Sequence, residues 1–361
     1  MDEAARALAG TPADRQAKCL RTRIGGQGGA VGVHRSATGG VWVSGVVRCG
    51  HWTCPACGVA RARESAERLT ECFSAHLAGL GHDVWLLTLT LPHYEGEQTK
   101  YVAALYAAWR TFTAGRVWKN WKRRWGVVAA VRALDVTFRD GGTRWHPHFH
   151  VAVFARAAWL GLTPLRGMTP DERAEVLRTV GEELKEAWAQ AVLATGLEVK
   201  SRAALVETGA HLGGGEFAAC YLGKWGLDDE IGGAAFKDAS HLSLLDAGTE
   251  QARASYLAWR LAVDGRHWLS GLADACRVLG VVEVEDKPED LPLSQGEVAE
   301  VEPINVWIEA WEWPAVLRRG VGAVVAVVAS ATTQTEAEER VRVLLYGEGR
   351  WPPSFTVPGT A

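Results

Sequence analysis

Apolar residues recur along the chain with two spacings, one typical of helices and the other typical of strands. Apolar positions three or four residues apart predict helices over residues 59–80, 97–125 and 169–195. Apolar runs rich in β-branched and aromatic residues predict strands over residues 83–92 and 198–207, and two more within 127–154. Runs of strands and helices in this order favour an α+β fold with a mostly antiparallel sheet flanked by helices.

Turn and capping signals set the ends of several of these elements. The segment RDGGTR joins the two strand-like runs within residues 127–154, which predicts an antiparallel hairpin. Thr169 precedes the helix over 169–195, and Glu172 follows it by three residues, which is the pattern of a capping box. A Gly-rich turn after residue 207 leads to GEFAACYLGKWG, which we expect to form a short helix.

Three tryptophans lie within the helix predicted over residues 97–125. Trp118, Trp121 and Trp125 are spaced i, i+3 and i+7 and share one face, while the lysines and arginines around them fall largely elsewhere. We interpret these tryptophans as core residues rather than as platforms for nucleic-acid bases. The basic face of the same helix could still contact phosphates.

The C-terminal third of the chain changes in character twice. Residues from about 227 to 279 are helical in pattern and carry further tryptophans, and residues 283–303 are acidic and resemble a linker. The last unit, residues 304–347, has the pattern of a small helical or α/β appendage with one apolar run, VGAVVAVVA.

Composition and charge narrow the class of protein. The chain of 361 residues is 48% hydrophobic and 22% charged, which is typical of soluble globular proteins, and it contains no apolar run long enough to cross a membrane. The N-terminus is charged and lacks the apolar segment of a secretory signal, so we expect a cytoplasmic protein without a membrane partner.

The net charge of −3 is unevenly distributed. Residues 1–126 hold 17 Lys and Arg against 9 Asp and Glu, a balance of +8, and the remainder holds 22 against 33, a balance of −11. This asymmetry indicates an N-terminal half that faces an anionic partner, although a solvated surface with chance clustering has the same pattern.

Three of the seven cysteines lie in the segment CGHWTCPAC, at Cys49, Cys54 and Cys57. A Cys-x2-Cys pair can direct two thiolates at one tetrahedral ion, so the segment predicts a structural zinc site that needs a fourth ligand. Candidates for this ligand are Cys19, His34, His51 and Cys72. We favour Cys19, because a thiolate from a separate loop would close the site and hold the N-terminus. A disulfide or a redox-active pair is the alternative.

Three of the eleven histidines occupy alternate positions in RWHPHFHVAVF. On a strand, His146, His148 and His150 share one face, and Pro147, Phe149 and Val151 take the other. If the hairpin turns within DGGT, residues whose numbers sum to about 283 are paired, so Asp135 lies opposite His148 on the same face. Two imidazoles and a carboxylate can hold one divalent cation. A half-buried strand whose histidines form hydrogen bonds or face water is the alternative.

These segments together resemble a known protein family. HFHVAVF is similar to the His-hydrophobic-His signature of HUH endonucleases, and HPHFHVAVF resembles that of the replication initiator (Rep) proteins of rolling-circle plasmids. WLLTLTLP resembles the first motif of the family, ACYLGKW its tyrosine motif, and CGHWTCPAC the cysteine cluster found upstream in many members. The resemblance covers roughly residues 45–280.

The resemblance implies a fold, a chemistry and partners. The fold would be the HUH type, with a central antiparallel sheet, an N-terminal zinc-binding unit and a helical C-terminal extension. The chemistry would be origin-specific nicking and strand transfer with Mg²⁺ or Mn²⁺ held by His148, His150 and Asp135. The partners would be DNA at the plasmid origin, a host helicase and a host polymerase. The implied division is residues 1–78, the zinc-binding and basic region; 79–230, the catalytic domain; 231–282, a helical extension; 283–303, a linker; and 304–361, an appendage.

The same resemblance implies roles for three residues downstream of the histidines. Tyr221 would attack the phosphodiester and form a 5′-phosphotyrosine link, and Lys224, one helical turn further on, would lower the pKa of the phenol or contact the phosphate. Members often carry a glutamate one turn before the tyrosine. Here Phe217 holds that position, so Glu216 is the candidate, with Glu207 as the alternative. His93 and His146 are further candidates for the surroundings of the metal.

Other functions fit parts of the same pattern. A transposase or a mobilisation relaxase uses the same chemistry on another target. A zinc-stabilised DNA-binding regulator without catalysis would bind DNA but form no covalent adduct. The absence of a G-x4-G-K-[ST] phosphate loop argues against an initiator fused to a helicase.

Overall fold

A computed structural model describes most of the chain. The described residues are 14–24, 29–37, 41–54, 57–79, 82–92, 97–139, 144–156, 168–214, 249–281 and 303–347. The chain divides into two compact units. The first unit comprises Met1–Ala60 together with Asp286–Ala361, and the second unit comprises Arg61–Glu285.

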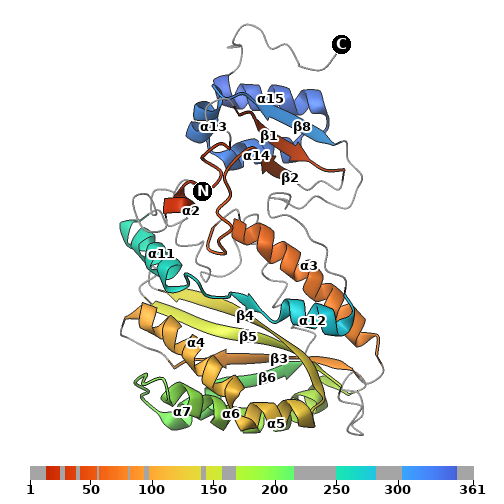
Figure 1. The fold of residues 1–361 in the computed structure, drawn as a ribbon, viewed down its shortest axis with the longest axis vertical. Coiled ribbons are helices and arrows are strands. Elements are labelled where there is room, and N and C mark those ends of the chain that lie inside the picture. The colour runs from red at the N-terminus through yellow and green to blue at the C-terminus, as the bar shows by residue number, and fades with distance from the viewer. Residues whose placement is uncertain are drawn as a thin grey trace. The chain divides into compact units, whose positions relative to one another are not determined.

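The second unit is built on an antiparallel sheet of five strands in the order β6-β3-β5-β4-β7 (Figure 1). The strands are β3 (Asp83–Thr90), β4 (Val127–Arg139), β5 (Arg144–Ala155), β6 (Ala210–Gly214) and β7 (Leu269–Ser270). The predicted strand over 83–92 and the predicted hairpin are confirmed. The strand that carries the histidines, β5, lies in the centre of the sheet, and this α+β architecture with antiparallel strands is the one that the sequence predicts.

Aromatic side chains pack one face of this sheet against three helices, α4 (Gln98–Ala114), α5 (Arg116–Arg124) and α6 (Pro170–Leu193). The Phe149 ring of β5 contacts the Tyr106 ring of α4 with centroids 5.1 Å apart. Trp118 and Trp121 are buried, and the Trp121 indole donates a 2.8 Å hydrogen bond to the Val180 carbonyl of α6. The interpretation of these two tryptophans as core residues is therefore confirmed.

The opposite face is covered by α3 (Cys57–Leu77) and α12 (Leu272–Leu279), which lie on the other side of the sheet in Figure 1. Leu69 and Phe73 of α3 and Leu272 of α12 join Ala152 and Phe154 of β5 in one apolar cluster. His146, His148 and His150 lie on this same face of β5, because side chains alternate along a strand. The helices thus cover one end of the face, and the histidines occupy the other.

One predicted helix is interrupted in the structure, and another begins as predicted. The helix predicted over 97–125 is two helices, because Gly115 between them has an extended backbone with φ −67° and ψ 153°. Glycine has the weakest helix propensity after proline, so the chain turns there at low cost. In the remaining sequence, α6 begins with the predicted capping box of Thr169 and Glu172.

The strand predicted over residues 198–207 is wrong. Residues Arg202–Thr208 form the helix α7, in which the Ser201 hydroxyl accepts a 3.2 Å hydrogen bond from the Ala204 amide. An N-cap serine stabilises a helix, and the apolar run alone does not distinguish a helix from a strand. The strand β6 follows directly. The rest of the described C-terminal part of this unit is α11 (Glu250–Ala262), β7 and α12.

The first unit combines segments from the two ends of the sequence. Its sheet has the order β2-β1-β8, with β1 (Val31–Arg35) paired to both β2 (Val41–Ser44) and β8 (Ile304–Ile308). Its helices are α2 (Asp14–Ala17), α13 (Trp313–Arg319), α14 (Val321–Ser330) and α15 (Gln334–Tyr346). The sequence analysis assigned residues 1–78 and 304–361 to separate parts. In the structure, strands from both share one sheet and one core.

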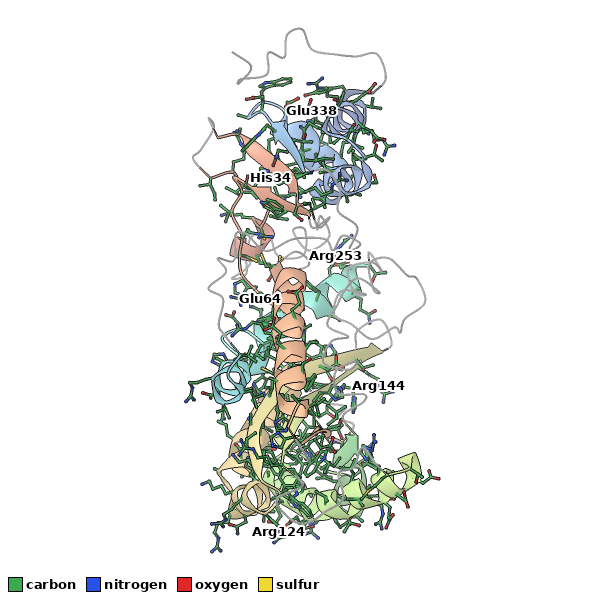
Figure 2. The ribbon with its side chains drawn as sticks, turned by 90° about the vertical axis from the view of Figure 1, so that its right-hand side faces the viewer. His34, Glu64, Arg124, Arg144, Arg253 and Glu338 are labelled. Carbon is green, nitrogen blue, oxygen red and sulfur yellow. The ribbon has the colours of Figure 1, made fainter. Side chains whose placement is uncertain are left out.

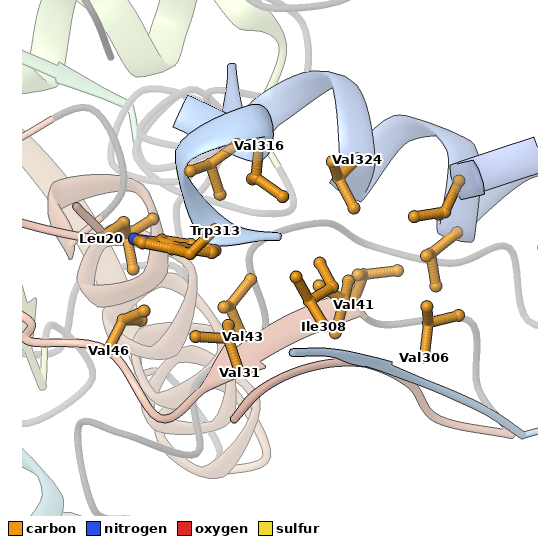
Figure 3. Packing of buried hydrophobic residues seen from close by; sticks show 14 of the residues in the cluster. Leu20, Val31, Val41, Val43, Val46, Val306, Ile308, Trp313, Val316 and Val324 are labelled. Atoms are coloured by element: carbon orange, nitrogen blue, oxygen red, sulfur yellow. The ribbon is translucent and has the colours of Figure 1, made fainter. Parts of the chain in front are cut away.

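Valine and isoleucine side chains dominate the core of the first unit (Figure 3). Val31, Val43 and Val306 of the sheet pack toward Val316 and Val324 of the helices, and all are buried. The apolar run VGAVVAVVA is therefore a core helix of this unit. No single described helix is long and apolar enough to span a membrane, and the pair α13 and α14 reaches that length only with a 90° bend between them.

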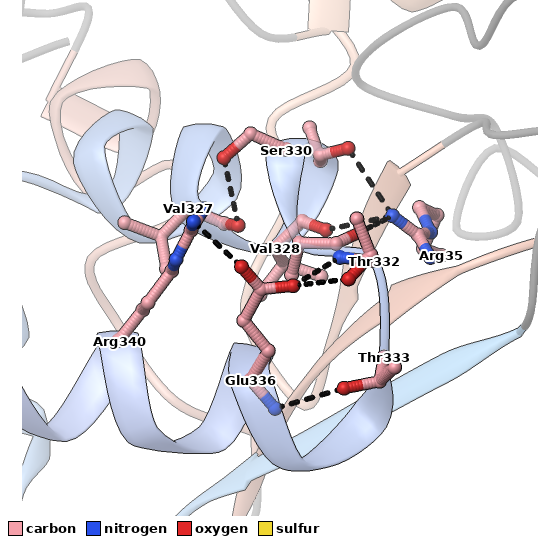
Figure 4. A network of polar contacts seen from close by, with 10 residues as sticks. Arg35, Val327, Val328, Ser330, Thr332, Thr333, Glu336 and Arg340 are labelled. Carbon is pink, nitrogen blue, oxygen red and sulfur yellow. Dashed lines mark hydrogen bonds and ion pairs between the residues drawn. The ribbon is translucent and has the colours of Figure 1, made fainter.

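Arg35 ties the end of α14 to the sheet (Figure 4). Its guanidinium donates hydrogen bonds to the carbonyls of Ala329, at 3.3 Å, and of Ala331. The last carbonyls of a helix have no partner within the helix, so a buried arginine is a suitable donor. Nearby, the Glu336 carboxylate accepts from the Thr332 amide at 2.6 Å and pairs with Arg340 at 2.6 Å.

Candidate metal centres

The pairing of β4 with β5 brings Asp135 directly opposite His148. This is the register predicted from the position of the turn. On the other side of β5, the strand β3 places Thr88 opposite His150. Side chains that are opposite one another on neighbouring strands point to the same face of the sheet. Asp135 of β4, the histidines of β5 and Thr88 of β3 therefore lie together on one face of the sheet.

The side chains of Asp135, His148 and His150 converge within ion-binding distance. The Asp135 Oδ2 atom lies 3.3 Å from His148 Nε2 and 3.7 Å from His150 Nε2. The two Nε2 atoms are 3.1 Å apart. Both histidines are buried, whereas 47% of the Asp135 side-chain surface is exposed to solvent. Three donor atoms thus face one point that remains open on the side of the carboxylate.

The other ring nitrogen of each histidine has its own partner. His148 Nδ1 lies 3.0 Å from the His146 carbonyl, so this nitrogen carries the proton and donates it. His150 Nδ1 lies 3.1 Å from the Thr88 hydroxyl. Such partners orient an imidazole and leave the lone pair of the opposite nitrogen available for a cation. Both Nε2 atoms are therefore the ones suited to bind an ion.

The electrostatics of the site keep the carboxylate charged. Burial alone would raise the pKa of Asp135, but the hydrogen bonds and charges of His148 and His150 outweigh it and hold that pKa well below its usual range. Burial alone would lower the pKa of His148, and the hydrogen bond and charge of Asp135 raise it. Two buried imidazoles beside a charged carboxylate form a favourable site for a cation. A bound cation would replace the protons that these groups otherwise share.

Four thiols form the second group. Cys19, Cys49, Cys54 and Cys57 each offer a sulfur, and the four sulfurs lie within 4.8 Å of one another. All four side chains are buried, and the Sγ atoms of Cys19 and Cys57 are 3.5 Å apart. The structure thus brings Cys19, the favoured fourth residue, to the segment CGHWTCPAC from a turn after α2.

The other three candidates for the fourth position are not part of this group. His34 forms hydrogen bonds with Asn305 and Ser44, and Cys72 lies on α3 with its sulfur 3.5 Å from that of Cys276. His51 is absent from the metal-binding groups found among the described residues. Cys19 is therefore the residue that completes a set of four.

Hydrogen bonds among the thiols separate their pKa values. The hydrogen bond from Cys19 is the largest influence on Cys57, whose pKa is lowered, and on Cys54, whose pKa is raised. Part of the group is thus stabilised as thiolate, the form that binds zinc. Four buried sulfurs around one point have the donor set and number of a closed structural zinc site.

Several residues named in the sequence analysis lie outside the described residues. These are Tyr221, Lys224, Glu216 and His93. The alternative glutamate, Glu207, is exposed near the end of α7. His146 lies on the metal face, and its ring centroid is 5.4 Å from that of His148, while its carbonyl accepts from His148 Nδ1.

Thr88 and His211 were missed by sequence reasoning. Thr88 contacts His150, and His211 of β6 pairs with Thr88, so its exposed side chain lies on the same face as the histidines. Alternation within each strand could have shown which residues share a face. The order of the strands, which brings β6 beside β3, is not contained in any local pattern.

Comparison with known proteins gives one family match. Residues 42–162 match the model of a family described as replication protein. The matched region includes Cys49, Cys54 and Cys57 and the strands β3, β4 and β5, with both histidines and Asp135, and it ends before Tyr221. No curated protein and no solved structure matches the chain.

Proposed function

We propose that the protein starts rolling-circle replication by nicking and rejoining DNA at an origin. The match of residues 42–162 to a family described as replication protein supports this proposal. The observation that carries the proposal is the group of Asp135, His148 and His150 on adjacent strands. A protein that only binds DNA has no need of a buried, partly open set of cation ligands.

Asp135, His148 and His150 would hold one Mg²⁺ or Mn²⁺, because the set mixes a carboxylate with two oriented imidazoles. When bound there, the cation supplies charge stabilisation to the phosphate oxygens of the scissile bond. Other residues of the chain hold the metal ligands in position. Thr88 and the His146 carbonyl orient the two imidazoles, and the central strand β5 holds them rigidly in the sheet.

Tyr221 would be the nucleophile, on the strength of its place in the motif ACYLGKW. Its phenolate oxygen would bond to the phosphorus, and the 3′ oxygen of the preceding nucleotide would leave, so that a 5′-phosphotyrosine and a free 3′-OH result. Lys224 would stabilise the phenolate. Glu216, or Glu207 in its place, would activate a water molecule for termination. We also propose that the domain over 79–230 has the HUH fold.

Cys19, Cys49, Cys54 and Cys57 would hold a structural Zn²⁺ in the first unit. The free 3′-OH would serve a host polymerase, with a host helicase opening the duplex, in the cytoplasm. A transposase or mobilisation relaxase would use the same centre, and the family match favours replication. The non-catalytic regulator is the alternative from another class.

The test is a search for a covalent protein–DNA adduct. Purified protein with Mg²⁺ or Mn²⁺ is mixed with single-stranded fragments that span the DNA around its own gene, and adducts that survive SDS are sought. The expected result is an adduct with wild-type protein and none with Tyr221→Phe or His148→Ala. Tyr346→Phe, which removes a hydroxyl bonded to Glu312 in the first unit, should keep full yield.

The regulator alternative predicts a different outcome. Folded wild-type protein that binds these fragments but forms no adduct with either cation would overturn the nickase proposal. An adduct that persists in Tyr221→Phe would overturn the choice of nucleophile and leave the metal centre in place.

A further inference from the structure

Three aromatic rings lie side by side on the outward face of the sheet in the first unit. Along β8, Ile304, Val306 and Ile308 are buried and face the helices, so Trp307 points the other way. Along β2, Val41 and Val43 are buried, and Trp42 points outward. His34 of the central strand pairs with Trp42, so its ring lies between the two indoles. We call Trp42, His34 and Trp307 the ring platform.

The rings of the platform are held in a defined arrangement. The His34 ring stacks on that of Trp42, with centroids 5.2 Å apart and planes at 25°. It meets the Trp307 ring edge to face at 5.3 Å. Both nitrogens of His34 are engaged, Nδ1 with Asn305 Oδ1 at 2.8 Å and Nε2 with Ser44 Oγ at 2.7 Å. Side chains from the two outer strands, β2 and β8, thus fix the central ring (His34 is labelled in Figure 2).

Gly32 leaves the space that the His34 ring needs. A Cβ atom at this position would lie 2.2 Å from His34 Nε2 and 2.8 Å from Ser44 Oγ. A side chain there would push the ring off the sheet. The arrangement of the three rings therefore also depends on the absence of a side chain at Gly32.

The platform remains open on its Trp307 side. Trp307 is 54% exposed, although the ring beside it is buried and fully hydrogen-bonded. A flat indole held in place at the surface offers its π face to another planar group without further loss of side-chain entropy. Bases of nucleic acid are such groups, and one base stacked on an aromatic ring typically contributes about 1–3 kcal/mol.

Charge indicates which planar ligand fits. Residues 15–60 of this unit, which include β1 and β2, hold six Lys and Arg and no Asp or Glu. Arg35 holds the end of α14, so the basic character of the segment, rather than any single unpaired cation, is what would attract an anion. His34 and Trp42 lie in this basic segment, and Trp307 lies on the neighbouring strand β8. Basic residues beside outward aromatic rings are typical of surfaces that bind single strands, where cations contact the phosphates and rings contact the unpaired bases.

We propose that the ring platform binds single-stranded DNA by stacking an unpaired base on Trp307, beside His34 and Trp42. The inference rests on the proposed function only in that it takes DNA as the ligand. Duplex DNA does not fit the platform in the same way, because its bases already stack on one another and hide their faces.

The test compares two tryptophans of similar exposure in the same unit. Trp311 is 57% exposed and stacks on Tyr346 rather than on the platform. Binding of a fluorescently labelled oligothymidylate to the full-length protein is measured by anisotropy without added divalent cation. Trp307→Ala should weaken binding about tenfold, and Trp311→Ala should leave it unchanged. Trp307→Phe, which keeps a ring, should retain most of the affinity.

Photocrosslinking and a measurement of the oligomeric state show whether single-stranded DNA or a second copy of the chain binds the ring platform. Photocrosslinking with 5-iododeoxyuridine in the oligonucleotide, mapped by mass spectrometry, should label a peptide that contains Trp307. Trp307→Ala that binds oligothymidylate as tightly as wild type does, or that loses duplex affinity by the same factor, would overturn the proposal. A change from dimer to monomer in Trp307→Ala, with unchanged DNA affinity, would make a second copy of the chain the occupant.

The outcome is independent of the nicking test. If no adduct forms but Trp307→Ala loses affinity for single strands, the platform stands and the nickase proposal fails. If the adduct forms but Trp307→Ala binds oligothymidylate normally, the nickase proposal stands and the platform fails.

Discussion

The hydroxyl of Thr88 holds the His150 ring in the orientation that points Nε2 toward His148 and Asp135, the other two ligands proposed for a cation. Thr88 itself would not touch the ion. Its position follows from the pairing of β3 with β5, so the residue is invisible to any motif that considers the histidine strand alone. At this scale, the metal centre depends on partners of the ligands as much as on the ligands.

Replacing Thr88 with valine should weaken cation binding without unfolding the protein. Valine has nearly the same shape and removes only the hydroxyl, and loss of such a partner typically lowers metal affinity about 10- to 100-fold. Mn²⁺ binding is followed by the loss of the electron paramagnetic resonance signal of the free ion.

Thr90→Val is the matched control for this change. Thr90 lies on the same strand and face, opposite His148, but its hydroxyl bonds to the Thr208 carbonyl. It should bind Mn²⁺ as wild type does. Equal weakening in both variants would show that the strand, rather than the Thr88 hydroxyl, determines the affinity.

At the scale of elements, local signals in the sequence place the ends of helices where side chains provide the caps. The capping box of Thr169 and Glu172 begins α6 at the predicted residue. The Ser201 cap begins α7 within a run that was predicted as a strand. Periodicity over ten residues was ambiguous there, while the cap and the following Gly209 would have identified a helix.

The Thr169 cap should contribute measurably to stability. Thr169→Ala removes the acceptor of the Glu172 amide, and losing such a cap costs about 1 kcal/mol. For a unit of this size, the melting temperature should fall by about 2–4 °C. Thermal unfolding is followed by circular dichroism.

Thr179→Ala in the middle of the same helix provides the comparison. Its hydroxyl donates to the Glu175 carbonyl one turn back, and alanine has the better helix propensity. Its melting temperature should equal or exceed that of wild type. A fall as large as that of Thr169→Ala would show that the cap has no special role.

At the scale of the whole molecule, the first unit joins residues from both ends of the sequence. The strand β8 pairs with β1 across more than two hundred and fifty residues, and its Ile304 and Ile308 complete the core. The four thiols close the N-terminal part of the same unit, since Cys19 precedes β1 and Cys57 begins α3. A bound ion there would reinforce the hydrogen bonds that already join the segment around Cys19 to the segment that precedes Cys49.

Cys54→Ser should release zinc from the protein. The wild type is expected to carry about one zinc ion per chain at a closed four-sulfur site. Cys72→Ser is the control, since Cys72 is equally buried but pairs with Cys276 away from the group. Zinc is counted by mass spectrometry of the metal after gel filtration. Full zinc content in Cys54→Ser, or none in the wild type, contradicts the site.

Local order along the chain was enough to establish the α+β class, the hairpin register that sets Asp135 opposite His148, and the three clustered cysteines. These features depend on residues close in sequence, where alternation and turn geometry leave few options. The remaining features needed tertiary structure: Thr88 beside His150, the decision for Cys19 among the four candidates for the fourth thiol position, β8 beside β1, and the ring platform. In each of these features, residues far apart in the sequence lie side by side. No periodic pattern in the sequence predicts such contacts, because they form when apolar faces are buried against one another and are not set by local backbone geometry.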